Sequence, residues 1–136
     1  MGGANCQLSA SDSTYLQGGP VYRDCAVDTR ARLLDERVTP DFQPSSPQTS
    51  GRQCYSAVIE FVVDTAGIAE VETARVARTN DQSFADALIR MVPRLRYHPA
   101  RKNDMPVRQI VQFSRAVALV AVPAGQVPRA SASPPC

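Results

Sequence analysis

Ten residues in the middle of the chain constrain the fold most, because they have the pattern of a β-strand with one fully apolar face. The segment is CYSAVIEFVV, from Cys54 to Val63. Side chains on a strand alternate between its two faces, so one face carries Ala57, Ile59, Phe61 and Val63. β-branched and aromatic residues also favour strands. A strand of this kind must bury its apolar face against another layer of the protein.

The residues that follow predict that this strand turns back on itself. Residues 64–67 are DTAG. An aspartate at the first turn position and a glycine where φ is positive are typical of a tight hairpin turn. Residues 68–77 then resume as a second strand. Its alternation breaks near Glu72 and Thr73, which predicts a β-bulge.

A helix and a long last strand complete the predicted fold. Asn80 and Asp81 are candidate helix caps. An apolar stripe at helical spacing follows, made of Phe84, Ala87, Leu88, Met91 and Val92. Residues 107–120, VRQIVQFSRAVALV, predict the final strand. The order strand, strand, helix, strand indicates an α+β fold, a small antiparallel β-sheet with one helix packed on one face. The predicted core consists of Ile59, Phe61, Val63, Val71, Val76, Phe84, Leu88, Met91, Ile110 and Phe113.

Composition divides the chain into four parts. Residues 1–20 are rich in small and polar residues, so we expect a flexible N-terminal segment. Residues 21–53 are expected to provide a lead-in strand and a loop, the latter at 43–52, that pack on the domain. Residues 54–120 form the predicted domain. Residues 121–136 contain four prolines and are expected to form a disordered tail.

Charge and motif content exclude several classes of function. The chain has 136 residues, and its 15 Lys and Arg against 13 Asp and Glu give a net charge of +2. This balance argues against a nucleic-acid partner. No run of about eighteen apolar residues predicts a membrane span. The sequence has no nucleotide-binding, nucleophile or zinc motif, and its single histidine, His98, has no companion ligand at metal-binding spacing. We therefore expect no catalytic residue, no cofactor and no metal.

The four cysteines point instead to an oxidising compartment. They are Cys6, Cys25, Cys54 and Cys136, which allow three full pairings. We expect a disulfide between Cys25 and Cys54, because these residues flank the start of the folded part. That bridge would close a loop of about thirty residues and add about 3 kcal/mol of stability. Cys6 and Cys136 are left free, paired with each other or lost in processing. The alternative is four reduced thiols in a reducing cell.

The final strand is the candidate binding element. A strand at the edge of a small sheet exposes unpaired N–H and C=O groups, which accept an extended peptide by strand addition. The expected partner-binding edge consists of Arg108, Gln109, Ile110, Val111, Gln112, Phe113 and Ser114. Proline at Val111 would abolish binding if that N–H faces the partner, although Val111 could instead be paired inward. The alternatives are that residues 31–38 or a second copy of the chain cover this edge.

Four motifs in this order and spacing resemble the C-terminal domain of the energy transducer TonB family. Residues 58–67, VIEFVVDTAG, resemble its V-x-F-x-V-D-x-x-G hairpin. The helix that contains Phe84 resembles its L-D-x-A-A-L-x-A-V helix. Residues 95–100, LRYHPA, resemble its W-R-F-x-P-A signature, and residues 103–107, NDMPV, resemble its N-G-x-P-V turn. The resemblance covers about residues 54–116.

The resemblance implies a non-enzymatic periplasmic or cell-envelope domain. In that family the last strand pairs with an extended segment of an outer-membrane receptor during TonB-dependent transport. Leu95 stands where the family has tryptophan, and Asp104 stands where it has glycine. The sequence shows neither the membrane anchor nor the Pro-rich spacer of a full transducer. We therefore expect a fragment of a transducer or a stand-alone domain, with no membrane insertion by this chain.

The alternative function is that of a stand-alone structural or dimerising module. It would use the same strand edge to form a homodimer instead of binding a receptor peptide. Both readings depend on an accessible last strand.

Overall fold

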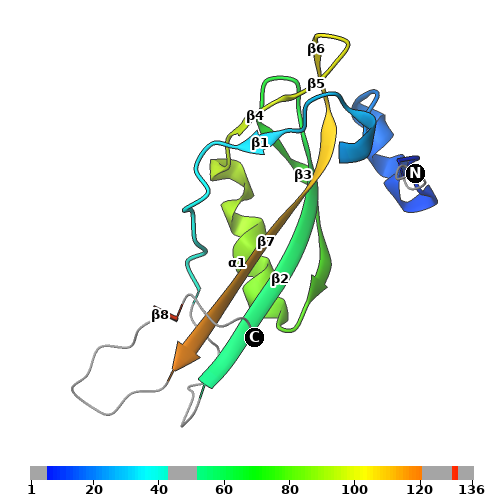
Figure 1. Cartoon of the computed structure of the whole chain (residues 1–136). Helices are drawn as coiled ribbons and strands as arrows, with labels where there is room; N and C mark the ends of the chain where they lie inside the picture. The colour runs from blue at the N-terminus through cyan, green and yellow to red at the C-terminus, as the bar shows by residue number, and fades with distance from the viewer. Residues whose placement is uncertain (1–5, 43–51, 121–129, 132–136) are drawn as a thin grey trace.

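A computed structural model describes residues 6–42, 52–120 and 130–131 (Figure 1). Two 3-10 helices come first, η1 (Ala10–Gly18) and η2 (Asp24–Ala26). The strands and helices that follow are β1 (Arg32–Leu33), β2 (Arg52–Val63), β3 (Ala69–Thr79), α1 (Gln82–Met91), η3 (Val92–Arg94), β4 (Tyr97–His98), β5 (Ala100–Lys102), β6 (Met105–Val107), β7 (Gln109–Val120) and β8 (Ala130–Ser131).

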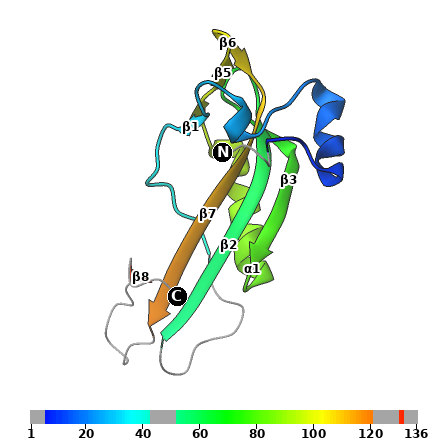
Figure 2. The same ribbon diagram turned by 45° about the vertical axis from the view of Figure 1, so that its right-hand side comes forward.

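The main sheet is built on the pairing of β2 with β7. The two strands have 12 residues each and pair antiparallel along their whole length, from Arg52 opposite Val120 to Val63 opposite Gln109. The strand order is β3-β2-β7-β8, and β1–β4 and β5–β6 form two small sheets. Helix α1 lies across one face of the main sheet (Figures 1 and 2). The predicted α+β class, with a small antiparallel sheet, is confirmed.

The predicted hairpin turn after β2 is present. The Asp64 side chain accepts hydrogen bonds from the N–H groups of Ala66 and Ile68, both at 2.9 Å. Gly67 has a φ of 83°, which favours glycine. A Cβ atom at this position would also lie 2.0 Å from the Tyr97 carbonyl oxygen. Asp64 and Gly67 therefore fix both the turn and its close approach to β4.

The predicted bulge in β3 is also present, and it corrects one residue of the predicted core. The register shifts as β2 passes from Glu60, opposite Arg75, to Val62, opposite Glu70. The Thr73 hydroxyl replaces the lost main-chain partner, because it accepts from Val62 N–H at 2.9 Å and donates to Glu70 C=O at 2.6 Å. The bulge takes Val71 out of the regular alternation. This side chain is 46% exposed, so its assignment to the core was wrong.

The main core lies between α1 and the sheet. Asp81 caps the helix by accepting from the Phe84 N–H at 3.0 Å, as the sequence predicted. The buried residues of the helix face those of the sheet, among them Phe84, Leu88, Met91, Ile59, Phe61, Val63, Val111 and Phe113. Val76 is half-buried against this core. The apolar stripe read from the sequence is therefore the face that the helix buries.

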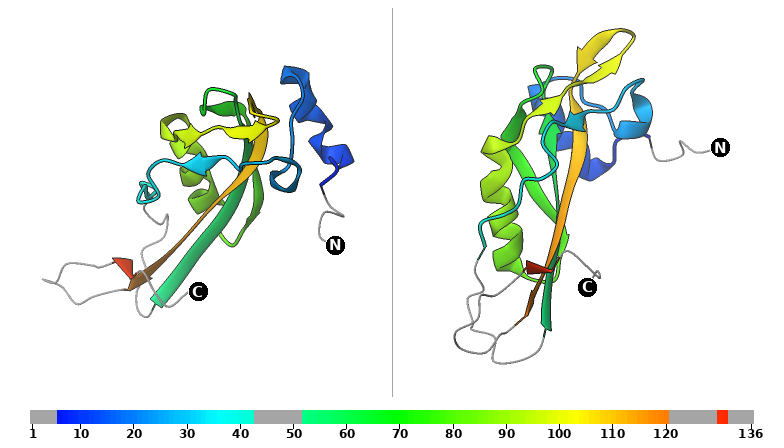
Figure 3. Two further views of the ribbon diagram at one scale, coloured as in Figure 1. Left: turned by 45° about the horizontal axis from the view of Figure 1, so that its top comes forward. Right: turned by 60° about the vertical axis from the view of Figure 1, so that its left-hand side comes forward.

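The N-terminal segment is folded onto the opposite face of the sheet. Helix η1 places Tyr15 in a second apolar cluster, which also contains Val21, Val62 and Ile110. Figure 3 shows this segment beside the end of the sheet where β7 begins. The prediction of a flexible segment is thus wrong for residues 6–20, and residues 1–5 lie outside the described residues.

The observed disulfide joins Cys6 to Cys25, so the expected Cys25–Cys54 pairing is wrong. Cys25 lies in η2, which contacts β7. Cys54 pairs in register with Ala118, nine residues along β7 from Gln109. Nine strand residues span about 30 Å, whereas a disulfide needs Cα atoms about 6 Å apart. Cys54 is disulfide-bonded as well.

Several predicted segments fall on residues that the structure does not describe. The loop expected at 43–52 is described only from Arg52 onward, and the tail expected at 121–136 only at β8. Strand β8 pairs antiparallel with Ala118 and Leu119 of β7. Within the described ranges, no helix has the length and apolar character needed to cross a bilayer.

The Tyr15 hydroxyl gives a test of the second cluster. It is buried, and no described residue hydrogen-bonds to it. Burial raises the pKa of Tyr15 to about 12. Because an unpaired buried hydroxyl destabilises the folded state, Tyr15→Phe should leave stability unchanged or raise it by about 1 kcal/mol in urea unfolding. Tyr15→Ala is the control and should cost about 3 kcal/mol. A loss above about 1 kcal/mol in Tyr15→Phe would contradict this placement.

Candidate functional site

A groove runs beside the predicted partner-binding edge. Its volume is about 500 Å³. One wall is β7, from Gln109 to Arg115, and the other is the lead-in segment around β1. Core side chains, including Tyr97 and Phe113, contribute to the lining. The groove therefore separates the edge of β7 from the segment that follows η2.

The main chain of β7 faces this groove at alternate residues. Tyr22 N–H donates to Arg108 C=O at 3.0 Å, and Ile110 N–H donates to Tyr22 C=O at 2.9 Å. Arg108 and Ile110 thus direct their main-chain groups away from β2. Since this direction alternates along an antiparallel strand, Gln112 and Ser114 also point away from β2. No other described residue forms a main-chain hydrogen bond with Gln112 or Ser114 on that side.

Val111 points the other way. It is paired with Phe61 of β2, and it lies between two residues whose main chains face the groove. Of the two orientations that the sequence left open, the structure has the inward one. A proline at Val111 would therefore break the β2–β7 ladder and would not probe the edge.

Both ends of the open edge are closed by other parts of the chain. Tyr22 covers it at Arg108 and Ile110. At the other end, the Arg115 guanidinium donates to Ser114 C=O at 2.8 Å, and it also donates to the carbonyls of Val38 and Glu36 at 3.0 and 2.9 Å. One alternative from the sequence was that residues 31–38 cover this edge. In the structure, these residues are bonded to β7 through the side chains of Gln109 and Arg115. Between these ends, three main-chain groups have no hydrogen-bond partner among the described residues: Gln112 N–H, Gln112 C=O and Ser114 N–H.

Arg108, the first residue of the predicted edge, has a different role. Its side chain is 9% exposed and forms a two-pronged ion pair with Glu70, at 2.7 and 2.6 Å. The hydrogen bonds that Arg108 donates to the Glu70 carboxylate raise the pKa of Arg108 above its ordinary value. The same guanidinium donates to Tyr15 C=O at 3.0 Å and Gly19 C=O at 2.7 Å. The Arg108 side chain therefore holds η1 against the sheet, and it is not available to a binding partner.

The remaining predicted residues divide between the interior and the surface. Gln109 is buried, and its side chain accepts from Ala31 N–H at 2.8 Å. Ile110, Val111 and Phe113 are core residues whose side chains are covered. Gln112 and Ser114 are exposed. The structure thus narrows the accessible part of the predicted edge to these last two residues.

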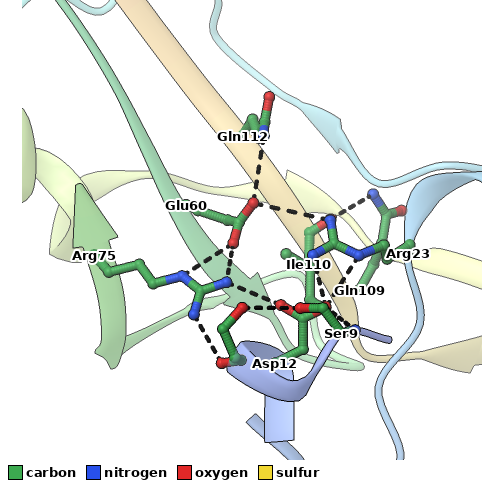
Figure 4. Close-up of polar contacts among 9 residues, drawn as sticks. Ser9, Asp12, Arg23, Glu60, Arg75, Gln109, Ile110 and Gln112 are labelled. Atoms are coloured by element: carbon green, nitrogen blue, oxygen red, sulfur yellow. Dashed lines mark hydrogen bonds and ion pairs between the residues drawn. The ribbon is translucent and has the colours of Figure 1, made fainter. Parts of the chain in front are cut away.

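A buried ion network next to the groove was not predicted from the sequence (Figure 4). Asp12 is fully buried and accepts from Arg23 at 2.6 Å, from Arg75 at 2.9 Å and from Ser9 N–H at 2.9 Å. Glu60 also pairs with Arg75, and it accepts from the Gln112 side chain at 3.3 Å. The network thereby connects η1, both strands of the hairpin and β7.

The S-x-x-D spacing of Ser9 and Asp12 is the sequence signal that could have revealed this segment. It is the signature of a capping box, and the Asp12 carboxylate accepts from the Ser9 N–H as that signature predicts. Burial opposes the ionisation of Asp12, but hydrogen bonds from Ser9, Arg23 and Arg75 outweigh it. The pKa of the Asp12 carboxyl is therefore below its ordinary value of 3.8.

No known protein family, curated protein or solved structure matches this chain. Among the described residues, no group of three His, Cys, Asp or Glu side chains is placed to hold a metal ion. The groove instead offers main-chain donors and acceptors beside core side chains. Such an arrangement can bind an extended chain through its backbone.

Asp12 gives a pH-dependent test of the network. Asp12→Asn should cost about 2 kcal/mol at neutral pH, because two arginines lose a charged acceptor. The folded-state pKa is lowered, so this contribution is complete above 3.8 and is lost as the pH falls through the folded-state value. The stabilities of the wild type and of Asp12→Asn in urea unfolding should thus differ at about pH 7, and the difference should shrink as the pH falls well below 3.8. A difference that stays constant or grows on acidification would contradict this account.

Proposed function

We propose that this chain is a non-enzymatic protein-binding domain that accepts an extended peptide at the edge of β7. The main support is the stretch at Gln112 and Ser114, where β7 directs into the groove main-chain groups that no described residue pairs. An extended chain supplies the matching donors and acceptors by strand addition.

The sequence supports one particular setting for this activity. The motifs from the hairpin to the last strand resemble the TonB C-terminal domain, so the proposed partner is an extended segment of an outer-membrane receptor. The Cys6–Cys25 disulfide fits an oxidising compartment such as the periplasm. We therefore place the proposed binding event in the cell envelope.

Two substitutions at Gln112 test the proposed edge. Gln112→Pro removes an N–H that faces the groove while leaving the β2–β7 hydrogen bonds in place, and proline is tolerated on an edge strand. Gln112→Thr is the matched control, because it also loses the Glu60 contact but keeps the main-chain N–H. We expect the proline variant to weaken peptide binding by about tenfold or more, and the threonine variant to bind like the wild type within about threefold.

The measurement is an amide-shift titration of the labelled chain with extended heptapeptides taken from candidate outer-membrane receptors. Unfolding curves of the three proteins check that each is folded. Saturable shifts at Gln112 and Ser114 that are lost in Gln112→Pro support the proposal. Equal binding by a folded Gln112→Pro variant would exclude this edge. A mass that doubles with concentration and no peptide-induced shifts would favour the self-associating module instead.

A further inference from the structure

The wall of the groove opposite β7 is also a strand edge. Leu34 N–H donates to Arg96 C=O at 2.9 Å, and Arg32 lies opposite His98 in the β1–β4 pair. Arg32 and Leu34 thus direct their main chains toward β4. By the same alternation, Ala31 and Leu33 direct theirs away from β4. The hydrogen bond from Ala31 N–H to the Gln109 side chain of β7 agrees with this direction.

Leu33 therefore faces the groove from the side of β1. Within the part of the chain that the structure describes, neither its N–H nor its C=O forms a hydrogen bond away from β4. Gln112 faces the same groove from β7. The groove is consequently bounded on both sides by main-chain groups that no described residue pairs, and an extended chain in the groove can pair with either wall.

Long side chains hold the two walls apart. Ala31 is tied to Gln109, and Val38 is tied to Arg115, so the lead-in segment runs parallel to β7. Neither tie is a main-chain bond between the two strands. Strand β1 lies beside β7 (Figure 3) but pairs with β4 in a separate sheet. Neighbouring strands lie about 4.8 Å apart, so the two walls must stand about 9.6 Å apart in a complex with one inserted strand.

We propose that the peptide is inserted between β7 and β1 and pairs with both of them. This inference rests on the proposed function and specifies its geometry. The inserted strand would join the β3-β2-β7 sheet to the β1–β4 pair and form one continuous sheet. Gln112 and Ser114 pair with one side of the peptide, and Leu33 pairs with the other. Strand addition in this protein is then two-sided, unlike addition to an open sheet edge.

The groove also defines the side chains that such a peptide carries. Leu33, Tyr97 and Phe113 line the groove and belong to the main core or pack against it, so the central inward-facing residue is apolar. The outward-facing residues lie beside the exposed Gln112 and Ser114 and are polar. Arg32 lines the groove and has no carboxylate partner within the described ranges. The groove lining as a whole has four arginines against three carboxylates, so acidic residues at the ends of the peptide, near Arg32 and Arg115, complement its charge.

The probe is the pentapeptide acetyl-Glu-Thr-Val-Thr-Glu-amide, with three analogues that each carry one N-methyl group on a central residue. An N-methyl group removes one main-chain donor. Consecutive donors of an extended peptide point to opposite sides. A two-sided site therefore needs the N–H of the valine and those of the threonines, whereas a one-sided site tolerates methylation at alternate residues.

Amide-shift titrations of the full chain with these four peptides distinguish the possibilities. We expect each analogue to bind about fivefold or more weakly than the parent peptide, with the Leu33 amide shifting together with those of Gln112 and Ser114. Unchanged affinity for methylation on alternate residues, with a silent Leu33, would overturn insertion but keep edge addition. No saturable shifts with this probe or with the receptor heptapeptides would overturn both proposals.

A pair of variants tests the β1 wall directly. Leu33→Pro removes the N–H that faces the groove, and Leu33→Ala removes most of the same side chain but keeps the N–H. Insertion predicts that the proline variant binds the parent peptide about fivefold more weakly than the alanine variant. Equal affinities of the two folded variants would exclude a role for this N–H.

Discussion

The pairing of β2 with β7 determines both where the core lies and which main-chain groups of β7 face the groove. Its register places the apolar side chains of both strands under α1, and it sets which residues of β7 direct their main chains outward. Because these directions alternate, the same ladder that buries Val111 and Phe113 presents Gln112 and Ser114 to the groove. A shift of one residue would exchange the two sets and remove both the core and the open edge.

The N-terminal segment limits how much of that edge is accessible. Its apolar contact through Tyr15 is small, and most of its attachment is polar. Arg108 holds two of its carbonyls, and the Asp12 network ties it to the hairpin. This attachment brings Tyr22 to β7, where Tyr22 forms main-chain hydrogen bonds with Arg108 and Ile110. The N-terminal segment has little apolar surface to bury. Its folding therefore depends on ion pairs and hydrogen bonds such as those of Asp12 and Arg108.

Local pattern was sufficient to predict the hairpin, the bulge, the helix cap and the long last strand. Each of these features depends on residues that lie close together in the sequence, as the turn depends on Asp64 and Gly67. The position of η1 could not be predicted in the same way. Its attachment depends on ion pairs between residues far apart in the chain, such as Asp12 with Arg75. The disulfide was misassigned for a related reason, because the separation of Cys25 and Cys54 depends on the length of β2 and β7.

For the candidate site, the sequence predicted a binding edge on the last strand, but it did not reveal which residues of that strand direct their main-chain groups into the groove. Gln112 and Ser114 differ little in type from Gln109, which is buried and already bonded to Ala31. The distinction comes from Tyr22 and Arg115, which lie at the two ends of the groove. Neither has a sequence pattern that reveals a closing role. The length of strand edge that a partner can reach depends on the tertiary structure, because residues distant in the sequence decide which parts of the edge are covered.

The short open stretch of β7 between the Tyr22 and Arg115 contacts has a kinetic consequence for the proposed binding. The three open main-chain groups of β7 and the two of Leu33 allow about five main-chain hydrogen bonds to an inserted peptide. At about 1 kcal/mol each, these correspond to a dissociation constant of about 0.2 mM. With an ordinary association rate of about 10⁶ M⁻¹s⁻¹, the proposed complex would last about 5 ms. A partner bound in this way would be sampled quickly and released readily, so sustained attachment would require additional contacts or a tethered partner.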